Sequence, residues 1–245
     1  MATTTATGQL TLPGQAAAPD GPIDLSGMFL THFGFRRDLI AFSAAAARTP
    51  VSDRKTWKAL AKRWQHFSSV LHKHHTAEDE GLWPLLLERV RAAGDVEAVA
   101  TLEVMAREHQ QIDPLLARCS ASFARLASLG CDSSHLVLPS DLAQLSALLH
   151  GHLRHEEREA LAEVQQYLTV EEWQRLEKEV FSKSYKTRDL PFVVCWTLHG
   201  LPDEGREALF ARSDAPPRPM WSVFRPGFAR RERRAFRYVP RAAAR

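Results

Sequence analysis

The sequence of 245 residues lacks the long apolar runs that a membrane-spanning helix requires. No stretch approaches the length of about 18 apolar residues that crosses a bilayer, and residues 1–22 lack the charged and apolar regions of a secretory signal. The alternation of apolar and polar residues that marks strands is almost absent as well. We therefore expect a helical cytoplasmic protein without membrane contact, in which residues 1–22 form a disordered tail.

Cysteine is scarce. Cys119, Cys131 and Cys195 show neither CxxC nor zinc-type spacing, which argues against a disulfide framework and against a thiolate metal site. The composition is otherwise ordinary for a globular protein, with 44% apolar residues, 25% charged residues and a net charge of +3. The basic residues are nevertheless concentrated locally, because seven arginines fall within residues 230–245.

Helical periodicity dominates the rest of the chain. The pattern predicts long helices at residues 24–48, 55–91, 96–129 and 139–168, separated by segments that contain glycine or proline. Short connections favour antiparallel neighbours, so we expect an all-α protein whose residues 23–181 form an up-down-up-down four-helix bundle. A short fifth helix should follow, with Thr169 as N-cap and Glu172 completing a capping box.

The pattern loosens after the fifth helix. Residues 182–245 predict a loosely structured C-terminal extension that packs on the bundle or on a second subunit of a homodimer, and residues 229–245 read as a basic tail. Arginines and aromatic residues in this tail suit a nucleic-acid or acidic-surface contact, although a solvated tail is the favoured interpretation.

Each long helix interrupts its apolar core stripe with histidine, and two of the helices add a glutamate four residues later. The histidines are His32, His74, His109 and His152, and the glutamates are Glu78 and Glu156. Residues four apart project from one face of a helix, so the two His–Glu pairs on alternate helices can converge.

Buried carboxylates require a partner for their charge. Burying one unpaired carboxylate costs several kcal/mol unless a cation or strong donors neutralise it. Imidazole and carboxylate donors without thiolate suit iron, manganese or zinc, and two carboxylates in a bundle centre favour a dinuclear site. In the alternative interpretation these side chains hydrogen-bond one another, or the helices are rotated so that they face water.

The predicted helices carry a recognisable set of motifs. The first has one histidine, the second has HHTAED and LWPLL, the third has REHQQIDPLL and the fourth has HLRHEE. Together they resemble the hemerythrin-like, or HHE cation-binding, family over residues 24–168. The resemblance implies a four-helix bundle with a non-haem di-iron centre joined by an oxo or hydroxo bridge. It also implies that His32, His74, His109 and His152 are terminal iron ligands, that Glu78 and Glu156 are bridging ligands, and that His75 is an optional further ligand.

The sequence departs from the oxygen-carrying hemerythrins at two ligand positions. Their third helix supplies two histidines four residues apart, whereas His109 here is followed by Asp113; their fourth helix uses an aspartate five residues after the histidine, whereas Glu156 follows His152 by four. Fewer imidazoles argue against reversible oxygen storage. Glu108, beside His109, is expected to orient a ligand imidazole.

These observations favour a cytoplasmic di-iron protein that binds or senses oxygen, or that reacts with a small oxidant such as peroxide or nitric oxide. Whether it turns over as an enzyme stays open at this point. The alternative is a metal-stabilised interaction or regulatory module whose basic C-terminal segment contacts a partner. The histidine-rich stripes argue against iron storage.

Overall fold

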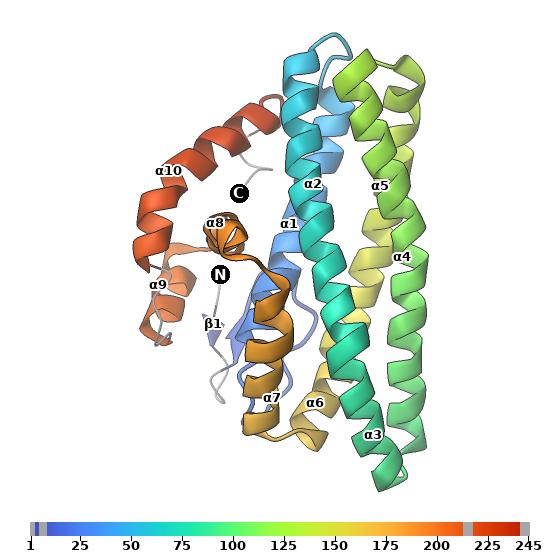
Figure 1. Cartoon of the computed structure of the whole chain (residues 1–245), viewed down its shortest axis with the longest axis vertical. Helices are drawn as coiled ribbons and strands as arrows, with labels where there is room; N and C mark the ends of the chain where they lie inside the picture. The colour runs from blue at the N-terminus through green and yellow to red at the C-terminus, as the bar shows by residue number, and fades with distance from the viewer. Residues whose placement is uncertain (1–2, 5–8, 213–217, 241–245) are drawn as a thin grey trace.

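The computed structural model describes residues 3–4, 9–212 and 218–240, and its described part is built almost wholly of helices (Figure 1). The bundle is made of α1 (Ser26–Arg48), α2 (Arg54–Ala77) continued by η1 (Glu78–Leu82) and α3 (Trp83–Ala93), α4 (Val96–Leu129), and α5 (Asp132–His155) continued by η2 (Glu156–Ala160) and α6 (Leu161–Tyr167). The segments η1 and η2 are single π-helical turns within otherwise α-helical rods. The all-α bundle expected from the sequence is confirmed.

The bundle helices are joined by short turns. Asp53 and Asp95 cap α2 and α4 by accepting hydrogen bonds from the backbone of their first turns. Gly94 (φ 73°) and Gly130 (φ 66°) end α3 and α4 in the left-handed conformation that favours glycine. Around the bundle, α2 packs against α4, α4 against α5, and α5 against α1. These neighbours and turns support the up-down-up-down order, which stays a prediction.

The fourth helix begins earlier than expected. The sequence was expected to remain irregular until Pro139, but α5 starts at Asp132 and Pro139 lies inside it. Leu138 and Leu142 on either side of the proline are fully buried, and their packing outweighs the hydrogen bond that proline cannot make.

The N-terminal segment differs from the disordered tail expected for residues 1–22. Leu10 and Leu12 are buried, and Gln9 Nε2 donates to the carbonyl oxygen of Ile23 at 2.6 Å. Two short strands, β1 (Thr3–Thr4) and β2 (Leu10–Thr11), pair antiparallel. Alternating leucines in the LTLP stretch thus anchor residues 9–22 to the bundle, whereas residues 1, 2 and 5–8 of the expected tail lie outside the described residues.

The C-terminal extension is more ordered than expected. The capping box of Thr169 and Glu172 is confirmed and begins α7 (Val170–Leu176). The helical segments that follow are η3 (Glu177–Phe181), η4 (Ser182–Ser184), η5 (Thr187–Asp189), α8 (Leu190–Leu198), α9 (Asp203–Arg212) and α10 (Arg218–Ala235). In Figure 1, α10 (red) lies beside the bundle and packs against α2 and α8. Residues 241–245 of the expected basic tail lie outside the described residues.

Buried ion pairs connect the extension to the bundle. Arg63 of α2 donates to Asp38 of α1 at 2.5 Å and to Glu232 of α10 at 2.6 Å. The indole of Trp196 in α8 donates to the same carboxylate of Asp38 at 2.7 Å. The buried indole of Trp196 and the charge network of Asp38, Arg63 and Glu232 therefore hold α8 and α10 against the bundle. Within the described residues, no helix combines the length and apolarity needed to cross a membrane.

Candidate metal centre

All seven residues that the sequence singles out as metal ligands are buried in the bundle interior, with at most 4% of their surface exposed. They come from α1 (His32), the last turn of α2 (His74 and His75), the first residue of η1 (Glu78), α4 (His109), α5 (His152) and the first residue of η2 (Glu156). The apolar stripes therefore predicted the buried face of each helix correctly. Because each of these side chains is buried, the alternative in which they face water is excluded.

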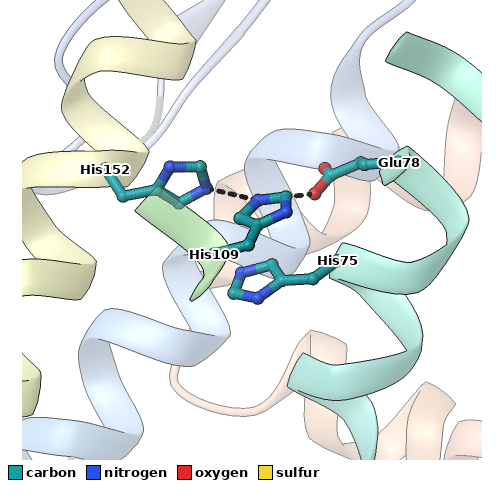
Figure 2. Close-up of side chains that lie close together, drawn as sticks. All are labelled: His75, Glu78, His109 and His152. Carbon is teal, nitrogen blue, oxygen red and sulfur yellow. Dashed lines mark hydrogen bonds and ion pairs between the residues drawn. The ribbon is translucent and has the colours of Figure 1, made fainter. Parts of the chain in front are cut away.

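The first ligand group consists of His75, Glu78, His109 and His152, each with a donor atom within 4.8 Å of the others (Figure 2). His109 Nε2 lies 3.0 Å from His152 Nε2 and 3.6 Å from Glu78 Oε2. The ring of His75 stacks on that of His109, with 3.9 Å between the centroids. His75, which the sequence left undecided, thus points inward.

The second ligand group consists of His32, His74, Glu78 and Glu156, again within 4.8 Å of one another. His32 Nε2 lies 3.3 Å from His74 Nε2 and 3.2 Å from Glu156 Oε2. His74 Nε2 lies 3.0 Å from Glu78 Oε1. Glu78 belongs to both groups, so its two oxygens face two neighbouring sites.

The hydrogen bonding of the centre is incomplete without a cation. Among the described residues, neither carboxylate oxygen of Glu78 or Glu156 and neither ring nitrogen of His75 makes a hydrogen bond of good geometry, while the glutamates have close contacts with His74 and His32. Such groups are costly to bury unless they are paired or coordinate a metal. Imidazole and carboxylate donors without thiolate match iron, manganese or zinc, so the residues present fit a pair of metal ions.

The protonation of the glutamates reflects this crowding. Burial and the charge of Glu156 raise the pKa of Glu78 well above its ordinary value. Burial alone would also raise the pKa of Glu156, but His32, through its charge and hydrogen bond, together with His152 and His74, lowers it. The two pKa values are therefore driven apart, so that without a cation the neutral form of Glu78 and the ionised form of Glu156 are favoured.

The imidazoles divide in the same way. Burial lowers the pKa values of His74 and His75 well below the ordinary value, so both are neutral and able to donate a lone pair. Burial also acts to lower the pKa of His32, but the adjacent Glu156 carboxylate raises it to about 9. Metal binding at His32 must therefore release a proton.

Three further carboxylates hold the outward nitrogens of ligand imidazoles. His109 Nδ1 donates to Asp79 at 2.9 Å, His152 Nδ1 donates to Glu108 at 2.9 Å, and His32 Nδ1 donates to Glu157 at 3.0 Å. Each contact fixes the tautomer that leaves Nε2 facing the centre.

One of these carboxylates was predicted from the sequence. Glu108 was expected to orient a ligand imidazole, and it contacts His152 of α5 with one oxygen and His155 with the other. Asp79 and Glu157 were not predicted to orient ligand imidazoles. The available signal was that each directly follows a predicted bridging glutamate.

The π-helical turns explain how adjacent acids can both serve the centre. η1 begins at Glu78 and η2 begins at Glu156. A π turn carries an extra residue, which changes the directions of the side chains around it, and such turns are frequent at functional sites. Glu78 and Asp79 therefore both reach His109, at Nε2 and Nδ1 respectively. Glu156 and Glu157 reach the same two nitrogens of His32.

Glu157 is itself held by a buried ion pair. Arg36 of α1 donates through both terminal nitrogens to the two oxygens of Glu157, at 2.7 and 2.9 Å. The backbone N–H of Ala16 donates to Glu157 Oε2 at 2.7 Å, so the N-terminal segment also contacts this carboxylate. The carboxylate that orients His32 is thus fixed from two sides.

Other candidates lie outside the centre. Asp113, which takes the place of a histidine in the oxygen carriers, is exposed on α4. His72 is exposed, and His150 is half-buried and belongs to neither ligand group. The described structure therefore supplies five imidazoles and two carboxylates at the centre.

A helical bundle with buried histidine and glutamate clusters defines a cation-binding protein of the bundle class. The sequence profile of the hemerythrin HHE cation-binding domain matches residues 28–164, more than half of the chain. The chain therefore belongs to the hemerythrin HHE cation-binding domain family, as its motifs indicated. Comparisons with curated proteins and with solved structures find no significant match.

Proposed function

We propose that the chain holds two non-haem iron ions joined by an oxo or hydroxo bridge, and that it binds or senses oxygen or reacts with a small oxidant such as peroxide or nitric oxide. The observation that carries the proposal is the pair of buried ligand groups that share Glu78, with glutamate oxygens that make no hydrogen bond of good geometry to the described residues. A single structural ion would leave one of these groups without a charge partner.

The residues that would hold the ions follow from the two groups. One ion would be held by His75, His109 and His152 and the other by His32, His74 and Glu156, with Glu78 available to both. When bound, the iron pair supplies redox chemistry and an electrophilic centre for a small molecule. Five imidazoles distinguish this donor set from the carboxylate-rich sites that suit iron storage.

The protein's contribution is positioning and exclusion of water. Asp79, Glu108 and Glu157 fix the ring orientation of three ligand histidines. Phe35, whose ring centroid lies 5.4 Å from that of His74, is fully buried and walls the centre with apolar surface. A small neutral oxidant can enter such an interior more readily than a charged reductant, which favours chemistry with oxygen, peroxide or nitric oxide.

Metal analysis combined with absorption spectra tests the proposal. We expect about two irons per chain and near-ultraviolet absorption from an oxo-bridged ferric pair, which disappears on reduction and returns with oxygen, peroxide or nitric oxide to different extents. Iron well below two per chain, or no near-ultraviolet band after aerobic oxidation, would contradict it.

A basic groove supports a second candidate function, that of a metal-stabilised module that contacts an acidic partner. Lys58, Lys62, Arg231 and Arg234 line a cavity of about 300 Å³ between α2 and α10, and all four side chains are exposed. Clustered cations of this kind attract nucleic acid or acidic protein surfaces.

Removal of the whole basic segment would be a poor test, because it would also remove Glu232 and its buried pair with Arg63. Neutralising the four groove cations to glutamine keeps that pair. The change should abolish partner capture while leaving iron content and spectra intact. A control variant with Arg107, Arg125, Lys178 and Lys183 neutralised carries the same charge change on other exposed surfaces.

A further inference from the structure

A cavity of about 290 Å³ reaches the edge of the metal centre from the side of the C-terminal extension. Its lining comes from α1, the end of α2 and the region from α7 to α8, and includes Met28, His74, Glu177, Phe181, Tyr185 and Val193. We call it the His74 pocket, because His74 is the residue that it shares with the two ligand groups in the described structure. The pocket therefore lies between the predicted metal site and the α7–α8 region.

The volume exceeds what a diatomic molecule or peroxide needs. A water molecule takes up about 30 Å³ in the liquid, so the pocket is several times larger than a two-atom ligand. It falls at the lower end of the size range of pockets that bind small organic molecules. Its size therefore points to an organic molecule rather than to the small oxidant alone.

The wall is largely apolar. Met28, Phe181, Leu190 and Val193 contribute aliphatic and aromatic surface, and the Phe181 ring centroid lies 6.3 Å from that of His74. Contact with such a wall favours a ligand with an apolar body, at about 25 cal/mol for each Å² removed from water.

The charged groups in the lining are already compensated. Lys73 Nζ lies 3.2 Å from the Asp189 carboxylate and 4.7 Å from the centroid of the Tyr185 ring. Burial, together with the nearby Asp24 carboxylate, raises the pKa of Glu177 to about 7, so it carries at most a partial charge near neutral pH. The lining thus presents no uncompensated cation for an anionic ligand.

Hydroxyl groups of Thr31, Ser182, Ser184 and Tyr185 supply the remaining polarity. Thr31 Oγ1 donates to the Gly27 carbonyl oxygen at 2.9 Å, and Ser184 Oγ donates to that of Phe181 at 2.6 Å, so their oxygen lone pairs can still accept. Because a hydroxyl group both donates and accepts, a ligand with one hydroxyl group matches this arrangement.

We infer that the His74 pocket binds a small, uncharged organic molecule with a mainly apolar body and one hydroxyl-type polar group, next to the metal centre. The inference goes beyond the proposed function and does not depend on it, because the pocket lining contains a single predicted ligand residue. It assigns to α7–α8 and the segments between them the role of a binding wall.

Titration of three compounds with one carbon skeleton tests the inference on the iron-loaded protein. Benzyl alcohol is the expected ligand, and benzoate and benzylammonium are the charged comparisons. Calorimetry should give binding of benzyl alcohol at least tenfold tighter than of either ion. Equal affinity for all three, or no binding of the alcohol, would overturn the inference.

Pocket variants locate the binding. Val193→Phe fills the pocket from α8, and Ser182→Trp fills it from an exposed position at which a large side chain does not threaten the fold. Lys183→Trp is the matched control, because Lys183 is exposed beside Ser182 and does not line the pocket. Both pocket variants should weaken benzyl alcohol binding at least tenfold and the control should not; unchanged binding in both would refute the assignment.

A second readout separates this inference from the proposed function. Protons of benzyl alcohol should relax faster in its complex with iron-loaded protein than with zinc-loaded protein, because the pocket adjoins a ligand histidine. Pocket-dependent binding by a protein that holds no iron would uphold the inference while the proposed function fails. Iron loading without any binding of the alcohol would do the reverse.

Discussion

Replacement of the two glutamates one at a time should have unequal effects on metal content. Glu78 belongs to both ligand groups, whereas Glu156 belongs only to the group with His32 and His74. Glu78→Gln should therefore weaken both ions. Glu156→Gln should weaken one and leave the ion held by His75, His109 and His152 in place.

The size of the effect follows from the loss of a charged ligand. Changes to residues that merely orient ligands cost 10- to 100-fold in metal affinity, so removal of a carboxylate ligand should cost about 100-fold or more, equivalent to about 2.7 kcal/mol. At an iron concentration about 100 times the wild-type Kd, bound metal stabilises the fold by about 2.7 kcal/mol. A 100-fold weaker site retains only about 0.4 kcal/mol of that stabilisation.

Metal-free protein should respond in the opposite direction. Glu78 and Glu156 are fully buried and their oxygens make no hydrogen bond of good geometry among the described residues. Glutamine at position 78 removes the free-energy cost of burying a second carboxylate. The metal-free Glu78→Gln protein should therefore unfold at a temperature no lower than metal-free wild type.

Iron content per chain and thermal unfolding with and without iron provide the assay. We expect about two irons for wild type, about one for Glu156→Gln and less than one for Glu78→Gln. Two irons retained by Glu78→Gln, or both lost from Glu156→Gln, would refute the shared role of Glu78. Unfolding of metal-free Glu78→Gln well below wild type would refute the charge argument.

Three further changes test other parts of the structure. Arg36→Met leaves the buried Glu157 without its two-pronged partner and should lower the free energy of unfolding by about 3–5 kcal/mol in urea titrations, with an unchanged midpoint contradicting the burial of this pair. Asp38→Asn weakens the contact with Arg63 and should speed amide hydrogen exchange in α10 more than in α4; uniform exchange would count against a local tie. Because burial raises the pKa of Glu177 from 4.5 to about 7, the folded protein loses stability as pH rises through that interval, and Glu177→Gln should remove the loss. After a discount for partial exposure the variant should gain about 1–2 kcal/mol at pH 8, and parallel pH profiles of the two proteins would show that the argument is wrong.

Six of the seven candidate ligands could be predicted because each lies on a repeating apolar stripe, whereas His75 lies off its stripe and was suggested by the family resemblance. A polar residue at a core position, such as His74 or His152, can be recognised from the sequence because helical spacing alone assigns it to the buried face. Motifs then added the family, which the profile match to residues 28–164 confirms. The C-terminal and N-terminal segments lacked such a period. Packing of the C-terminal extension on the bundle was one of two alternatives predicted, whereas the helices within it and the anchoring of residues 9–22 were not predicted.

Residues that act across helices were harder to predict. Glu108 lies next to His109 in the chain but contacts His152, because neighbours in a helix point about 100° apart. Asp79 and Glu157 contact ligand histidines from the π-helical turns that begin at Glu78 and Glu156. A one-residue insertion in a helical turn has no signature in apolar spacing.

The sequence by itself determined the class of fold, the buried face of each helix and six of the seven candidate ligands, because helical periodicity records which side chains leave water. His75 was added by the family resemblance. The tertiary structure decided how those ligands divide into two groups around Glu78, which carboxylates orient them, and that residues 173–193 help enclose a pocket beside His74. Those features depend on distances between helices, on the turns at η1 and η2, and on the docking of a segment without periodicity, none of which is written in the spacing of residues along one chain.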